Sequence, residues 1–141
     1  MTPEQMQLVR LTLAQATTDP LALGRDFYRR LFVLAPDLRA RFHGDVDTES
    51  LKLKEALTLA FGALIDMRLL VATLDSIARR DVARGLSEQH CRAIAQSLIW
   101  AIERRVGGAF THHVCNAWIA FLAVVMTCLH GSVVGLSRRA A

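Results

Sequence analysis

Apolar residues recur at intervals of three and four along most of the chain, which is the spacing of one helix face. In the first such run they are Met6, Val9 and Leu13. Thr2 is placed to cap this helix, with Pro3 at its first position and Gln5 as the reciprocal capping-box partner. The pattern therefore predicts a first helix from the third residue onward.

A second helix is predicted to open at Asp19-Pro20 and to end at Ala35-Pro36, because proline breaks the helical hydrogen-bond ladder. Its apolar positions are Leu21, Leu23, Phe27, Leu31 and Leu34. We expect a short helical turn over residues 37–42 and a loop over residues 43–45 to follow.

The remainder of the chain also reads as helices. One is predicted to start at Thr48, with an apolar stripe wide enough to be largely buried. The next spans residues 69–84, another is capped by Ser87 and runs to residues 107–108, and the last runs from about Thr111 to His130. No segment alternates with a period of two, so the predicted class is all-α, with six or seven unequal helices packed around a central pocket.

The amino-acid composition limits the classes of protein to which the chain can belong. The chain has 141 residues, 52% of them hydrophobic and 21% charged, which is typical of one compact domain over residues 1–141. The net charge of +4 is spread in arginine pairs, which argues against a nucleic-acid groove. Cys91, Cys115 and Cys128 form no CxxC pair, and the N-terminus has no secretion signal, so a reducing, cytoplasmic location is expected.

The C-terminal region is strongly apolar, with no Asp, Glu, Lys or Arg between Arg105 and Arg138. A membrane anchor over residues 118–136 is one interpretation, although Trp118 and His130 within it fit a buried final helix better. Seven large apolar residues are too many for one buried stripe: Ile119, Phe121, Leu122, Val124, Val125, Met126 and Leu129. We therefore predict a homodimer through the last two helices.

Several segments carry a family resemblance. Residues 26–32, followed by Ala35-Pro36-Asp37-Leu38 and Arg41-Phe42, resemble the second and third helices of bacterial globins, both single-domain haemoglobins and the globin module of flavohaemoglobins. Residues 77–86 resemble that family's proximal helix, and residues 88–90 and 117–118 resemble landmarks in its last two helices. The resemblance covers residues 5–131 and implies a globin-like fold that holds haem and binds oxygen or another diatomic ligand.

The resemblance implies roles for four residues on the distal side of the haem. Tyr28 matches the tyrosine that donates to the iron-bound ligand, and Phe42 matches the phenylalanine that wedges against the porphyrin. Leu53 falls at the gate position and Leu57 one turn further in. The alternatives are that Phe42 is a core aromatic and that Tyr28 is a buried phenol bonded to a backbone carbonyl.

The proximal side departs from the family pattern. Asp81 stands where the iron-ligating histidine is expected, and His90 replaces the family's proximal tyrosine. His90 is therefore the candidate replacement metal ligand, and Asp81 the second, since a carboxylate would favour ferric iron. The alternatives to iron ligation are that Asp81 is a surface carboxylate and that His90 is a residue of the first turn of a helix.

Two function classes follow from these departures. The first is a haem protein with atypical proximal ligation, and the second is a haem-free globin fold that serves as a regulatory or interaction module. The chain contains no reductase module, paired catalytic carboxylates or nucleophile–base spacing, so it is not expected to act as an enzyme on its own.

Overall fold

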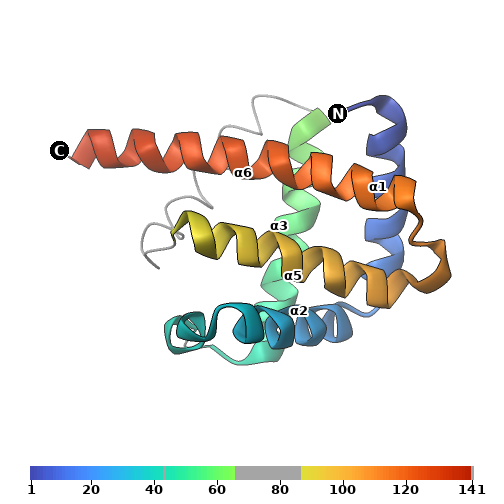
Figure 1. The fold of residues 1–141 in the computed structure, drawn as a ribbon, viewed down its shortest axis with the longest axis horizontal. Helices are drawn as coiled ribbons and strands as arrows, with labels where there is room; N and C mark the ends of the chain where they lie inside the picture. Colours follow the sequence, from blue (N-terminus) through green and yellow to red (C-terminus); the bar gives the residue numbers. More distant parts are fainter. Residues whose placement is uncertain (43, 66–86, 141) are drawn as a thin grey trace.

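The computed structural model describes residues 1–42, 44–65 and 87–140, with side chains described as far as Met126. In these ranges the chain forms helices and no strands (Figure 1). They are α1 (Pro3–Ala16), α2 (Pro20–Leu34), the 3₁₀ helix η1 (Pro36–Arg41), α3 (Val46–Ile65), α5 (Glu88–Val106), the 3₁₀ helix η2 (Gly107–Ala109) and α6 (His112–Ala140). The predicted all-α class is confirmed.

Most helix starts lie where local signals put them. The Thr2 hydroxyl accepts from the Gln5 backbone N–H at 3.1 Å, while the Gln5 side chain accepts from the Thr2 N–H at 3.0 Å. Asp19 caps α2 by accepting from the Ala22 N–H at 3.1 Å. Two boundaries differ from the prediction: α3 begins at Val46 rather than Thr48, and α6 continues past His130 to Ala140. The helix predicted over residues 69–84 lies outside the described residues.

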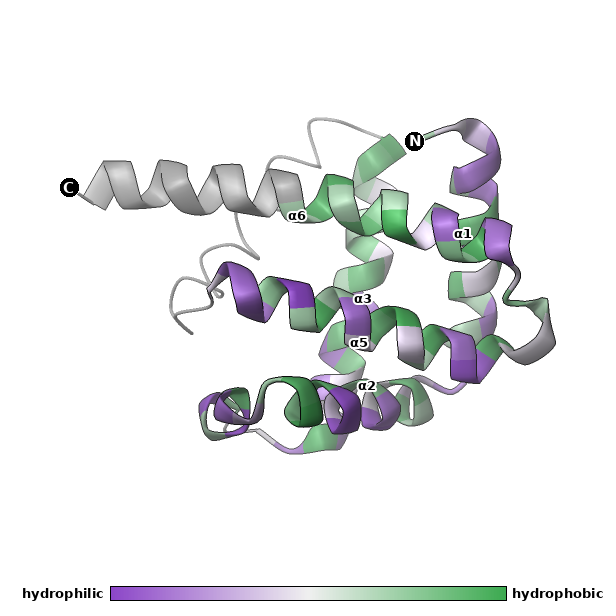
Figure 2. Ribbon diagram, in the orientation of Figure 1, coloured by the Kyte–Doolittle hydropathy of each residue, from purple (hydrophilic) through white to green (hydrophobic). Residues whose placement is uncertain are grey.

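The helices pack in crossing pairs around a shared core. α2 lies against both α3 and α5, and α1 lies against α5 and α6 (Figure 1). The hydrophobic residues are most continuous along α3 and the described part of α6, whereas α2 and α5 carry mixed faces (Figure 2). The largest fully buried side chains include Leu23, Leu31, Ile102, Trp118 and Phe121.

A buried polar chain fixes α6 on α1. Trp118 is fully buried, and its indole N–H donates to the Thr12 hydroxyl at 2.8 Å. Thr12 in turn donates to the Leu8 carbonyl at 2.6 Å, so both buried polar groups are paired. Trp118 therefore faces the protein interior, as a buried final helix requires. In the described part of the chain, no helix is both long and apolar enough to cross a membrane.

The crossing of α2 and α3 depends on Gly24. A Cβ built on Gly24 would lie 2.7 Å from the Ser50 Cα, and closer still to the Ser50 side chain. Ser50 has no room to retreat, because it is buried and its hydroxyl donates to the Val46 carbonyl at 2.6 Å. The two helix backbones can approach this closely only because residue 24 has no side chain.

We predict that Gly24→Ala lowers the free energy of unfolding by about 3 kcal/mol, because the added methyl group forces α2 and α3 apart. Gly62→Ala is the matched control, since a Cβ at Gly62 in α3 meets no atom within 4 Å. That variant should be neutral or gain about 0.5–1 kcal/mol, as expected for Gly→Ala within a helix. Urea unfolding followed by circular dichroism measures both, and equal effects of the two changes would refute the close crossing.

Candidate functional site

Four aromatic rings gather where α2, η1 and the start of α3 meet. The ring centroids of Tyr28 and Phe42 are 5.4 Å apart in an edge-to-face arrangement, and those of Phe32 and Phe42 are 5.7 Å apart. Phe27 packs on the other side of Tyr28 at 4.8 Å. Two residues that the sequence assigned to the distal side, Tyr28 and Phe42, are thus brought into contact from different elements.

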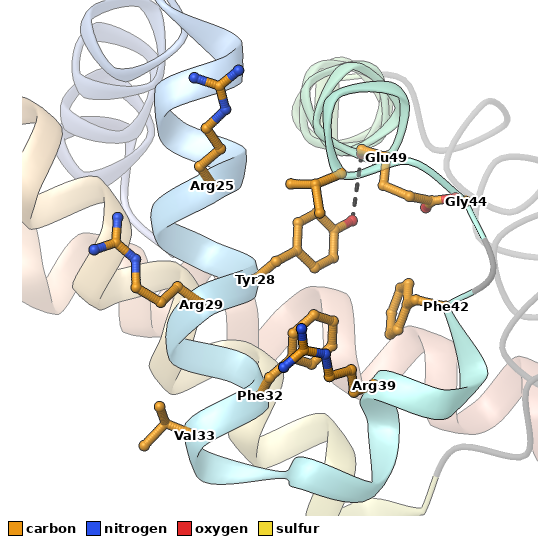
Figure 3. Close-up of a pocket in the computed structure, with 10 residues that line it drawn as sticks. Arg25, Tyr28, Arg29, Phe32, Val33, Arg39, Phe42, Gly44 and Glu49 are labelled. Atoms are coloured by element: carbon orange, nitrogen blue, oxygen red, sulfur yellow. Dashed lines mark hydrogen bonds between the residues drawn. The ribbon is translucent and has the colours of Figure 1, made fainter.

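Tyr28 is buried, and its hydroxyl donates to the Glu49 backbone carbonyl at 3.4 Å (Figure 3). This distance is at the long end of hydrogen bonding, so the bond is weak. The arrangement corresponds to the phenol-to-carbonyl alternative set out from the sequence. Tyr28 also lines a pocket between α2, η1 and α3.

The pocket beside Tyr28 has a volume of about 590 Å³. Figure 3 shows its walls, which come from α2, η1, the loop before α3 and the first turn of α3. Its lining residues are Arg25, Tyr28, Arg29, Phe32, Val33, Arg39, Phe42, Gly44, Val46 and Glu49. A pocket of this size, part apolar and part cationic, is large enough for a small organic molecule.

The arginines around the pocket differ in how they are paired. Arg25 forms a two-pronged ion pair with Asp47 at 3.0–3.2 Å, and Arg29 pairs with Asp26 at 3.0 Å. Within the described part of the chain, Arg39 has no carboxylate within ion-pair distance. On the α3 side, the buried Glu49 carboxylate lies 3.5 Å from the Lys52 ammonium group.

The two leucines assigned to the distal gate lie further along α3. Leu57 is buried in the core and Leu53 is partly buried against it. Neither lines the pocket beside Tyr28, whose only α3 residues are Val46 and Glu49. The structure therefore does not place all four distal candidates around one cavity within the described residues.

His90 occupies the first turn of α5 and is bonded through both ring nitrogens. The Ser87 backbone N–H donates to His90 Nδ1 at 3.1 Å, while the Ser87 hydroxyl accepts from the His90 N–H, also at 3.1 Å. Nδ1 must therefore carry a lone pair, so Nε2 carries the proton and donates it to Asp37 at 2.7 Å. In this arrangement neither ring nitrogen is free to bind a metal.

The second proximal candidate, Asp81, lies outside the described residues. Among the residues that are described, no group of three or more His, Cys, Asp and Glu side chains could hold a metal ion. The structure thus gives His90 a place in the fold and leaves the proximal assignments as predictions.

Sequence reasoning missed a buried carboxylate on α2. Asp26 is buried and faces three arginines: Arg29 on its own helix, and Arg104 and Arg105 at 3.6 and 3.2 Å on α5. The i, i+3 spacing of Asp26 and Arg29 was visible in the sequence, but the approach of α5 was not. Because Asp26 Oδ2 has no well-aligned hydrogen bond, this cluster is held by charge more than by geometry.

Comparison with known proteins relates the chain to haem proteins in two ways. No protein-family model matches it. It is 25% identical over 139 residues to a flavohemoprotein of Vibrio cholerae and 28% identical over 124 residues to one of Bordetella pertussis, matches that cover 94% and 85% of this chain. The chain spans about a third of the length of these relatives (35% and 31%).

Among solved structures, the chain is similar to a hexacoordinated heme protein from an anhydrobiotic tardigrade. The TM-score is 0.83 at 12% sequence identity, and the match covers 94% of this chain and 95% of the other. At that identity the likeness shows the fold alone, and it agrees with the globin-like fold that the sequence predicts.

The His90–Asp37 pair makes stability depend on pH. The hydrogen bond from His90 holds the pKa of Asp37 below its ordinary value of 3.8. The unfolded chain therefore binds the proton more readily, so the pair stabilises the folded chain above that value and its contribution fades as the pH falls through the lowered pKa.

We expect Asp37→Asn to be less stable than the wild type at pH 7, because the amide keeps a hydrogen-bond acceptor but loses the charge. The gap should be smaller at pH 3 than at pH 7 and should narrow further as the pH falls through the lowered pKa of Asp37, because protonation then removes the same charge from the wild type. Urea unfolding at both pH values measures this, and a gap of equal size at pH 3 and pH 7 would contradict the assigned tautomer and pairing.

Proposed function

We propose, from its similarity to bacterial globins, that this chain binds haem and, through the haem iron, oxygen or another diatomic ligand. The observation that carries the proposal is the 5.4 Å contact between Tyr28 and Phe42, which come from α2 and from the end of η1. These are the two residues that the globin resemblance assigns to the distal side. The globin fold and the flavohemoprotein relatives support it.

The distal residues suit that chemistry. A bound haem would supply the iron centre at which a diatomic molecule is held. Tyr28 would contribute a buried O–H donor, whose bond to the Glu49 carbonyl is long at 3.4 Å. Leu53 and Leu57 lie further along α3 and would contribute apolar surface to the haem rather than to the pocket beside Tyr28.

Two residues, His90 and Asp81, are candidates for the proximal ligand that would anchor the haem iron. For His90 to bind iron through Nε2, it would have to release Asp37; binding through Nδ1 would release the Ser87 N–H. Asp81 lies outside the described residues, so no described contact bears on ligation by it. We keep both residues as candidate anchors, with haem as the cofactor.

The second candidate function is a haem-free globin fold with a regulatory or interaction role. The observation that favours it is the full engagement of His90, which acts as a capping and cross-linking residue rather than as an available ligand. A cytoplasmic location and the absence of catalysis by the chain alone stay parts of both proposals.

Haem titration followed by the Soret band separates these functions. We expect stoichiometric uptake by the wild type, and for Asp81→His a haem affinity at least about tenfold higher, because an imidazole then occupies the family's ligand position. Glu4→His, which adds an imidazole at an exposed position of α1, is the matched control and should change nothing. No uptake by either the wild type or Asp81→His would exclude the haem proposal and leave the haem-free fold.

The same titration identifies the anchor. His90→Gln keeps a capping-box partner for Ser87 but cannot ligate iron as an imidazole does. If His90 is the anchor, this variant should lose tight haem binding while Asp81→Ala retains it. The opposite result assigns the anchor to Asp81.

We also propose the homodimer through α5 and α6. Of the apolar residues that suggested it, Phe121, Leu122 and Val125 are buried within the chain, whereas Ile119 is 51% exposed. Ile119→Glu should therefore convert a dimer to a monomer in sedimentation at micromolar concentration without detergent. Leu11→Glu, at a residue of α1 that is 48% exposed, is the matched control and should stay dimeric. A monomeric wild type would contradict the proposal.

A further inference from the structure

The pocket beside Tyr28 has apolar walls that the rest of the chain leaves open to solvent. Val33 on α2 is 65% exposed and Val46 on α3 is 41% exposed, and both line the pocket. Phe32 and Phe42 form a further wall, with their rings edge to face at 5.7 Å. Exposed apolar side chains that converge on a concave site are typical of a ligand pocket rather than of an ordinary surface.

The charges around this pocket are unevenly balanced. Arg25 and Arg29 are paired with Asp47 and Asp26, but Arg39 has no carboxylate partner within the described part of the chain. Figure 3 shows Arg39 rising from η1 beside Phe32, whereas Glu49 lies across the pocket on α3. Glu49 is itself paired with Lys52. An anionic group would therefore be attracted to the η1 side.

We propose that this pocket binds an aromatic carboxylate, with its ring against Phe32 and Phe42 and its carboxylate on Arg39. Three aromatic rings line the pocket, and edge-to-face or offset contacts favour another flat ring over an aliphatic chain. The planar guanidinium group of Arg39 can donate two parallel hydrogen bonds to a carboxylate. A ligand with two fused six-membered rings fits within the pocket volume of about 590 Å³.

This proposal does not rest on haem binding, although its pocket overlaps the proposed haem site. The two share Tyr28 and Phe42, but the pocket contains neither Leu53 nor Leu57, and none of its lining residues comes from α5 or α6. Its ligand would approach Tyr28 from the α2–η1 corner.

Calorimetric titration with naphthalene-2-carboxylate tests the proposal, with naphthalene-2-carboxamide as a neutral probe of the same shape. We expect the wild type to prefer the carboxylate. Arg39→Gln should lower carboxylate affinity about tenfold and leave carboxamide affinity unchanged, because one charge-assisted contact is lost. Arg10→Gln on α1 removes the same charge far from the pocket and should leave both affinities unchanged.

Val33→Asp provides a second variant at an exposed wall position, and it should also weaken carboxylate binding through charge repulsion. Equal binding of the two probes by the wild type, or unchanged carboxylate affinity in Arg39→Gln, would overturn the proposal. If the chain takes up no haem but binds naphthalene-2-carboxylate, only the haem proposal is contradicted.

Discussion

The close approach of α2 and α3 at Gly24 is the constraint on which the rest of the site depends. A side chain at this position would overlap Ser50, so the two helices meet backbone to backbone. Tyr28 lies one helical turn further along α2, and this contact brings its hydroxyl within reach of the Glu49 carbonyl. The separation of α2 and α3 also bears on the pocket, because Val33 of α2 and Val46 of α3 both line it.

α2 is held from its other side by charge. The buried Asp26 carboxylate faces Arg104 and Arg105 of α5, while the Trp100 ring lies 5.4 Å from the Arg30 guanidinium carbon and 4.9 Å from that of Arg104. A buried carboxylate without its partners would be strongly destabilising, whereas the partnered cluster contributes little net stability. Its effect is positional: together with Gly24, it fixes the rotation of α2 and so turns Tyr28 toward the pocket.

Interactions between residues close in the sequence could be predicted, whereas those between distant segments could not. The caps of α1, α2 and α5 depend on residues three apart, so Thr2, Asp19 and Ser87 were identified correctly. Tyr28 and Phe42 were chosen through a family resemblance, which carries long-range information that spacing lacks. The partners of His90 and Asp26 come from distant segments, and no local pattern reveals that Asp37 lies 2.7 Å from the His90 ring.

The place of His90 in the fold couples the two sides of the proposed haem site. Its bond to Asp37 ties the start of α5 to η1, and Phe42 is the residue that ends η1. If iron replaced Asp37 at Nε2, η1 would lose this tie, and Phe42 would be less firmly held against Tyr28. An anchor other than His90 would leave the bond between His90 and Asp37 in place. Iron ligation by His90 and the bond from His90 to Asp37 would therefore compete for the same nitrogen, Nε2. If Phe42 must stay in place against Tyr28, an anchor other than His90 is favoured.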